Sequence, residues 1–157
     1  MIRKLLLVSL LLGSSAAVAA PPAKFLNNAI QGDNSEIHLG HLISQHGSSQ
    51  DVRSFGDTLV SDHTQARTQA AGVASQLGVH ATDSIAPDAR REYAKLQHMH
   101  GAAFDREARR FMIHAHQMAI MAFEAQAHGS DKATAELARS QLPKFREHLH
   151  MAQSLHE

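Results

Sequence analysis

The sequence predicts an all-α protein: an antiparallel bundle of four long helices, with one short extra helix before the third long helix. Long stretches carry apolar residues at the three-to-four-residue spacing of an amphipathic helix, and glycine and proline separate them. No stretch alternates polar and apolar residues as a strand does. Long amphipathic helices joined by short turns pack as an antiparallel bundle.

The first two long helices are expected at residues 25–46 and 50–77, after an extended Pro21-Pro22 lead-in. Ser49 in the intervening Gly-Ser-Ser turn is a suitable N-cap, and Gly78 ends the second helix. Its apolar stripe is Val52, Phe55, Leu59, Ala66, Val73 and Leu77.

The second half of the chain divides in the same way. Pro87 is a good first residue for a short helix at about 88–99, and the third long helix is expected at 102–127. Ser130 or Asp131 caps the last helix, in which Pro143 removes one backbone hydrogen bond and predicts a kink.

The N-terminus has the pattern of a cleavable signal peptide. Arg3 and Lys4 precede an apolar run at residues 5–12, which is too short for a stable membrane anchor, and Ala17-Val18-Ala19 is an A-x-A cleavage site. We therefore expect a signal peptide at residues 1–19 and one domain at 20–157, with its core at about 25–155. An exported protein, periplasmic or secreted and without a membrane span after cleavage, follows from this interpretation.

Composition narrows the possible functions. The absence of cysteine excludes disulfides, thiolate metal sites and lipid attachment through cysteine. Loss of Arg3 and Lys4 leaves 13 basic against 15 acidic residues, so no basic face for nucleic acid is expected. Thirteen histidines are many for 157 residues, and most are expected on solvated helix surfaces.

Each long helix carries one polar residue at a position that belongs, by its spacing, to the apolar stripe of that helix. These residues are Glu36, His63, His116 and His148. Their three- and four-residue spacings to apolar neighbours place them on the core face. Counted from the nearest turn at about 1.5 Å per residue, Glu36 and His63 are nearly level, and His116 and His148 are about one turn apart. One polar layer is therefore possible.

Four buried polar groups must satisfy one another, because an unpartnered buried charge costs several kcal/mol. Two arrangements remain open: a hydrogen-bonded cluster that shares protons, and a transition-metal site. Three imidazoles and a carboxylate suit zinc, copper, iron or nickel. Asp62 and Glu147, each next to one of the histidines, point elsewhere on their helices and could at most orient a ligand.

Other metal patterns are weaker. A di-iron centre needs Glu-x-x-His pairs, but no glutamate lies three residues before any of the core histidines. His38 and His41 could bind a metal at the surface. Histidines near five methionines suggest copper(I), although methionine more often fills a core: Met99, Met112, Met118, Met121 and Met151.

Three stretches resemble one known family: "GDNSEIHLGHLISQHGSSQDVRSFGDTLVSDHTQA", "FDREARRFMIHAHQMAI" and "LPKFREHLHMAQSL". The sequence is similar to the exported bacterial proteins grouped as domain of unknown function 4142, which are often labelled outer membrane proteins. The resemblance covers about residues 25–155 and implies a ferritin-like four-helix fold and export, but no established reaction. The family's motif positions correspond to Glu36, Asp62-His63, Phe104-Asp105, His116 and His148. The family's usual tyrosine is replaced by Ala108.

The sequence thus predicts an exported binding protein that holds a transition metal, such as zinc, copper or iron, or a shared proton at Glu36, His63, His116 and His148. No catalytic residue is assigned, and the protein is more simply a binder than an enzyme. The two alternatives are a metal-free structural or stress-related envelope protein and a small ferritin-like metal-dependent oxidase. The sequence does not identify a protein partner.

Overall fold

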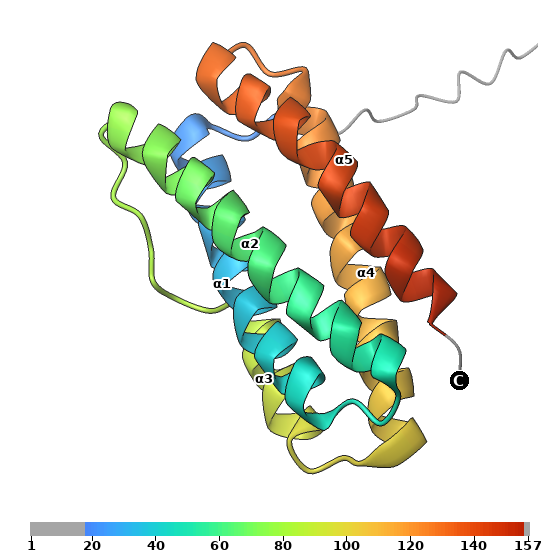
Figure 1. The fold of residues 1–157 in the computed structure, drawn as a ribbon. Helices are drawn as coiled ribbons and strands as arrows, with labels where there is room; N and C mark the ends of the chain where they lie inside the picture. Colours follow the sequence, from blue (N-terminus) through green and yellow to red (C-terminus); the bar gives the residue numbers. More distant parts are fainter. Residues whose placement is uncertain (1–17, 156–157) are drawn as a thin grey trace, which may run out of the picture.

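The computed structural model describes residues 18–155, which form five helices and no strand (Figure 1). The helices are α1 (Pro22–His46), α2 (Gln50–Gln76), α3 (Pro87–Leu96), α4 (Gly101–Ala127) and α5 (Lys132–Ser154). The predicted all-α class is confirmed, as is a short helix before the third long one. The expected signal peptide lies almost wholly outside the described residues.

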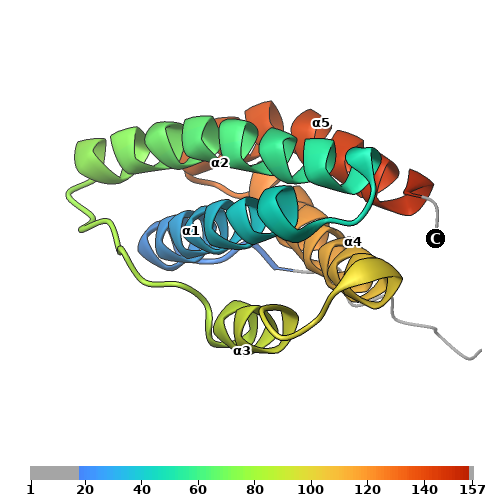
Figure 2. The same cartoon turned by 60° about the horizontal axis from the view of Figure 1, so that its bottom comes forward.

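Two pairs of long helices make up the molecule. The pair α1 and α2 packs over its whole length, as does the pair α4 and α5, and α2 also contacts α5 (Figure 1). By contrast, α1 and α4 make few contacts with each other, and the short helix α3 lies against both (Figure 2). The side of the molecule between α1 and α4 is therefore loosely packed.

Helix boundaries follow the expected caps, with small differences. The Ser49 side chain accepts a hydrogen bond from the Val52 amide at 3.2 Å, and Asp131 rather than Ser130 caps α5 by accepting from the Thr134 amide at 2.9 Å. Helix α1 begins at Pro22, earlier than expected, because proline fits the first helical position, where no amide donor is needed. Helix α5 continues through the exposed Pro143.

The short helix differs at its C-terminal end. Helix α3 ends at Leu96 rather than near Met99, and the chain turns before Gly101. Gly101 has a φ of +61°, in the left-handed region that side chains with a Cβ avoid. Residues 97–100 thus form the connection to α4 rather than the end of α3.

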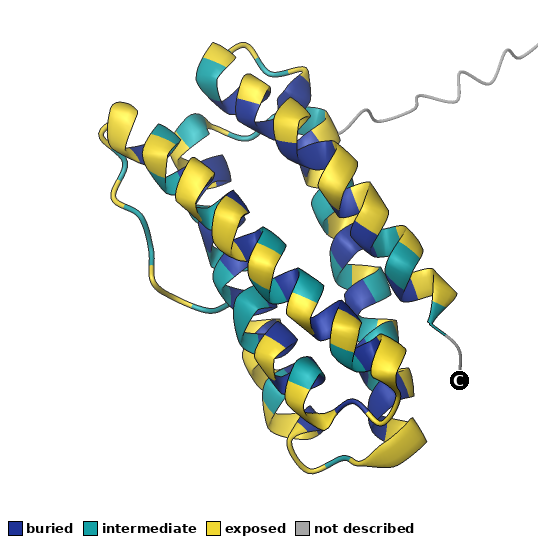
Figure 3. Ribbon diagram, viewed as in Figure 1, coloured by how far each residue is buried: buried dark blue, intermediate teal, exposed yellow. Residues whose placement is uncertain are grey.

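The apolar core has two parts, and buried residues recur along each long helix (Figure 3). Phe25, Phe123 and Phe145 belong to one part, and Leu39, Leu59 and Met112 to the other. On α2, α4 and α5 the histidine at 63, 116 or 148 falls between residues of the two parts. The histidines thus separate two hydrophobic clusters.

Two glycines let α1 and α2 approach closely. A Cβ on Gly56 would clash with the Ser44 amide nitrogen and would lie 2.7 Å from the Gly40 carbonyl oxygen. Gly56 therefore leaves no room for a side chain, and Gly40, where a Cβ would lie 3.0 Å from the Gly56 carbonyl oxygen, leaves little. The contact fixes how far α2 is shifted along α1, and this shift positions the residues of the next section.

Among residues 18–155, no helical segment combines the length and the hydropathy that a membrane span requires.

Candidate metal centre

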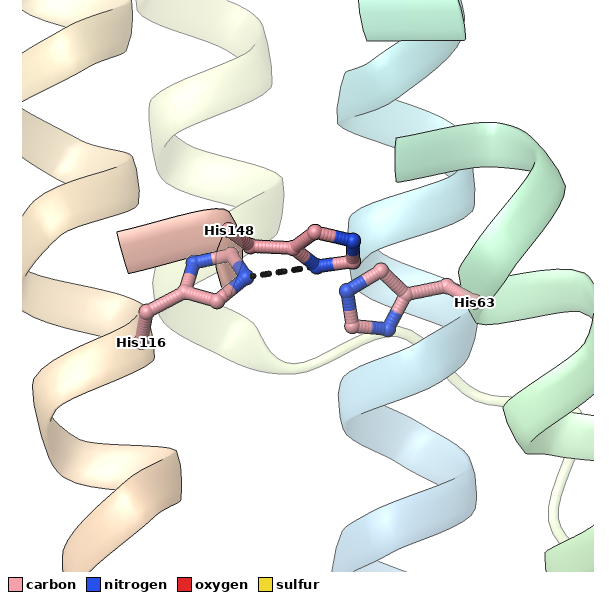
Figure 4. Close-up of side chains that lie close together, drawn as sticks. All are labelled: His63, His116 and His148. Carbon is pink, nitrogen blue, oxygen red and sulfur yellow. Dashed lines mark hydrogen bonds between the residues drawn. The ribbon is translucent and has the colours of Figure 1, made fainter. Parts of the chain in front are cut away.

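Three of the four predicted residues come together inside the bundle. His63 on α2, His116 on α4 and His148 on α5 each offer one ring nitrogen, and these three nitrogens lie within 4.8 Å of one another (Figure 4). The three residues are 4%, 1% and 0% exposed. We call them the histidine trio.

The outward nitrogen of each ring already has a partner. Nδ1 of His116 lies 2.9 Å from the carbonyl oxygen of Met112, one turn earlier on α4. Nε2 of His148 lies 2.9 Å from Oδ2 of Asp62 on α2. Nδ1 of His63 lies 2.9 Å from Oδ1 of Asp33 on α1.

These partners determine which nitrogens carry hydrogen in two of the rings. A carbonyl oxygen can only accept, so neutral His116 must carry its hydrogen on Nδ1. The carboxylate of Asp62 likewise accepts from Nε2 of His148. The remaining nitrogens, Nε2 of His116 and Nδ1 of His148, lie 3.3 Å apart, which is within hydrogen-bond distance (dashed line in Figure 4). With the hydrogens placed as above, both nitrogens present lone pairs and neither can donate to the other.

Two facing lone pairs repel each other unless a cation lies between them. Two nitrogen ligands bound to a tetrahedral metal at about 2.05 Å are themselves about 3.3 Å apart. Nε2 of His63, the third inward nitrogen, is buried and has no hydrogen-bond partner in the described structure. The spacing and the free third nitrogen both fit a bound metal ion.

A proton is a poor candidate for this cation. Burial lowers the pKa of His63 to about 4, although the nearby charge of Glu36 acts in the opposite direction. Burial also lowers the pKa of His148 to about 4, against the hydrogen bond to Asp62. At neutral pH both rings are therefore uncharged, which is the state that binds metals.

The two aspartates beside the trio have pKa values that are shifted in opposite directions. Despite partial burial, the pKa of Asp62 is lowered, because His148 hydrogen-bonds to it and Lys144 lies 3.4 Å away. Burial raises the pKa of Asp33 to about 8, which the positive charge of Arg67 offsets only in part. A metal cation on His63 would favour the ionised form of Asp33.

Glu36 borders the trio without joining it. Its Oε1 lies 4.0 Å from Nδ1 of His116, the nitrogen that faces Met112. Its Oε2 is buried and has no hydrogen-bond partner in the described part of the chain. Of the predicted four-residue layer, the structure brings together the three histidines and places the carboxylate next to them.

A cavity of about 460 Å³ reaches this centre from the side where α1 and α4 are loosely packed. Its lining is mostly apolar, with contributions from Phe25, Leu39, Phe111 and Phe123. The polar atoms along it come in part from the centre itself: Asp33, Glu36, His63 and His116. The cavity has the size and apolar character of a small-molecule pocket.

The model of one family, described as a domain of unknown function (DUF4142), matches residues 10–155. The chain belongs to the DUF4142 family. No curated protein matches the sequence. A crystal structure of a DUF305 fragment from Deinococcus radiodurans is similar in fold, with a TM-score of 0.75 and 18% identity over 87% of this chain and 96% of that one.

Several DUF4142 motif residues now have a structural role. Asp62 and His63 are adjacent in sequence but have different roles. His63 belongs to the trio, whereas Asp62 orients His148 of α5 through a hydrogen bond. Asp105 accepts hydrogen bonds from the backbone amides of Ser48 and Ser49 and from the Ser48 hydroxyl, so it ties α4 to the turn between α1 and α2.

Sequence reasoning missed Asp33, which is 2% exposed and bonded to His63. A signal for it exists, because Asp33 lies three residues before Glu36 and so shares its helix face. The sequence predicts an orienting role for Asp62, but it does not identify its partner, His148, on another helix.

Proposed function

We propose that this DUF4142 protein binds a transition-metal ion through Nε2 of His63, Nε2 of His116 and Nδ1 of His148. The observation that carries the proposal is the 3.3 Å separation of two buried ring nitrogens whose other nitrogens both face acceptors. Without a cation, that arrangement sets one lone pair against another.

The surroundings support metal binding as well. Histidine ligands usually donate their second N–H to a carboxylate or a backbone carbonyl, and each ring of the trio has such a partner. Three imidazoles suit zinc, copper, iron or nickel rather than magnesium or calcium. Three protein ligands leave further coordination positions free, on the side that the cavity reaches.

The decisive experiment uses untagged protein, because a polyhistidine tag would itself bind these metals. The metal content of the purified protein is measured by elemental analysis, and zinc, copper(II), iron(II) and nickel are then titrated into metal-free protein by calorimetry. We expect one ion per chain and a rise in melting temperature. His116→Ala should abolish both, whereas His150→Ala, two residues from His148 but exposed, should change neither.

Two outcomes would contradict the proposal. One is the absence of bound metal together with no thermal shift for any of the four ions. The other is equal loss of binding in His116→Ala and His150→Ala, which would indicate binding by surface histidines. Either result would favour the metal-free interpretation, in which the histidines and Asp33, Glu36 and Asp62 form a structural polar cluster.

The cavity favours a second candidate function, a small metal-dependent oxidase. Such an enzyme needs an open coordination position and a path for its substrate, and the cavity extends to His63 and His116. Metal-loaded protein is therefore tested for consumption of oxygen or peroxide. Turnover that is lost in His116→Ala would support this function. Metal binding without turnover would instead support the function of a metal-binding protein without enzymatic activity.

We also propose a ferritin-like, antiparallel four-helix arrangement and export to the periplasm or the medium. The two long helix pairs joined by short turns support the first. Arg3 and Lys4, the apolar run at 5–12 and the Ala17-Val18-Ala19 site support the second. N-terminal sequencing of protein from the periplasmic fraction tests export, and we expect the mature chain to begin at Ala20.

A further inference from the structure

Helix α4 carries a second group of metal-binding side chains at the cavity. His114, Met118 and Met121 occupy positions i, i+4 and i+7 of this helix, and all three line the cavity. Residues three and four apart on a helix lie above one another, with Cβ atoms about 5–6 Å apart. One imidazole and two thioethers therefore form a row on one face of α4, which we call the rim row.

The two methionines of the rim row do not fill the core. Met118 is 52% exposed and Met121 is 55% exposed, whereas Met112, on the same helix, is completely buried. Within residues 18–155, the other large hydrophobic side chains with comparable exposure are Val18 and Leu77. Core packing explains Met112 but gives no reason for methionine at 118 and 121.

We propose that His114, Met118 and Met121 bind a soft monovalent metal ion, copper(I), at the mouth of the cavity. Thioethers are soft ligands that select copper(I), and imidazole also suits copper. Zinc, magnesium and calcium are bound mainly by imidazole, thiolate or oxygen ligands, which this row largely lacks. The composition of the row therefore determines the class of ion.

The rim row is separate from the histidine trio. His114 and His116 lie two residues apart on a helix and so point in nearly opposite directions, and His114 is exposed whereas His116 is buried. The trio offers three imidazoles and no thioether. The protein would thus have two metal sites along one cavity, one with imidazole ligands and one with mainly thioether ligands, which are softer.

The test uses full-length protein under anaerobic conditions, with copper(I) delivered from a chromophoric chelator that reports the amount transferred. The double variant Met118→Leu/Met121→Leu should bind one equivalent less than the unaltered protein, or bind it at least tenfold more weakly. The control Met99→Leu/Met151→Leu changes two partly buried methionines outside the row and should behave as the unaltered protein. Zinc binding should be the same in all three.

Methyl-labelled methionine provides a direct measurement. On addition of copper(I), the methyl NMR resonances of Met118 and Met121 should shift, and that of Met99, which belongs to neither proposed site, should stay in place. His116→Ala should retain both shifts, so failure of the trio as a metal site and failure of the rim row are distinguishable. The proposal is wrong if both methyl resonances remain unchanged at saturating copper(I), or if the double variant binds copper(I) as well as the unaltered protein.

Discussion

At the scale of single residues, the second nitrogen of each ring decides what the histidine trio can do. Imidazole has one donor and one acceptor when neutral, so the group that faces one nitrogen fixes the role of the other. Met112 and Asp62 accept from His116 and His148, which turns a lone pair of each ring inward. The chemistry of the centre therefore depends on residues that would not touch the metal.

Asp33→Asn tests this dependence. The variant keeps the shape of the side chain next to His63 but cannot ionise, whereas a metal cation on His63 would favour the ionised form of Asp33. Because carboxylates that orient metal-binding histidines typically contribute a factor of about 10–100 in affinity, we expect metal binding to weaken by that factor. Calorimetry measures the affinity, with Asp51→Asn, at an exposed aspartate of α2, as the control. Equal affinities in the two variants would contradict the role assigned to Asp33.

At the scale of helices, the close contact of α1 with α2 sets the position of the centre. Gly40 and Gly56 face each other at this contact. Asp33 lies seven residues before Gly40, and His63 lies seven residues after Gly56. Seven residues are about two helical turns, so the contact between the glycines and the hydrogen bond between Asp33 and His63 require the same alignment of the two helices.

Substitutions of glycine within α2 should therefore have opposite effects. Gly56→Ala places a methyl group against the backbone of α1, and we expect the free energy of unfolding to fall by about 1–3 kcal/mol. Gly72→Ala meets no atom within 4 Å and should raise it by up to about 1 kcal/mol, because alanine favours helix. Chemical denaturation measures both values. Destabilisation of similar size in the two variants would show that the helix contact is not the cause.

The link from α4 to the turn between α1 and α2 gives another prediction at this scale. Asp105→Ala removes the acceptor for the Ser48 and Ser49 amides, and hydrogen bonds to charged groups contribute about 1.5–3 kcal/mol each. We expect lower stability and faster hydrogen exchange at these two amides. The control is Asp57→Ala, which removes a carboxylate that bonds to Ser44 within the same helix pair but contacts no turn amide. Unchanged exchange at Ser48 and Ser49 in Asp105→Ala would be inconsistent with this role.

At the scale of the whole molecule, a polar layer lies between two hydrophobic clusters. The clusters provide the burial that keeps His63 and His148 uncharged, and burial likewise keeps Asp33 protonated in the metal-free protein. These groups titrate at different pH in the folded and unfolded chain, so the stability of the metal-free protein must depend on pH.

The direction of this dependence follows from the pKa values. Between pH 4 and 6.5 the unfolded chain binds more protons at His63 and His148, so both make stability fall on acidification. Asp33 acts in the opposite direction between pH 3.8 and 8, because its folded form keeps its proton. Among these three groups, the two histidines outweigh Asp33 and give a net fall in stability towards acid. Above pH 6.5 Asp33 is the one of the three that makes stability fall as pH rises.

We therefore expect the metal-free protein to be most stable near pH 6.5, with slopes of at most about 1.4 kcal/mol per pH unit on either side. Denaturation at pH 5, 6.5 and 8 in the presence of a chelator measures the profile. Asp33→Asn should remove the fall on the alkaline side and steepen the fall on the acid side. Stability that rises continuously from pH 5 to 8 would contradict the pKa assigned to Asp33.

The sequence by itself determined the helices and the inward direction of the polar residues. Caps such as Ser49 and Asp131 and the helical spacing of apolar residues are local properties, and local properties can be read along the chain. The same spacing placed His63, His116 and His148 in the core.

Only the tertiary structure decided which polar groups meet. The contact of Gly40 with Gly56 aligns α1 with α2, which brings Asp33 to His63 and leaves Glu36 beside the trio. The packing of α2 against α5 brings Asp62 within hydrogen-bond distance of His148. Such pairings depend on how far one helix is shifted along another and on how it is rotated, and residues on separate helices fix these quantities jointly through packing.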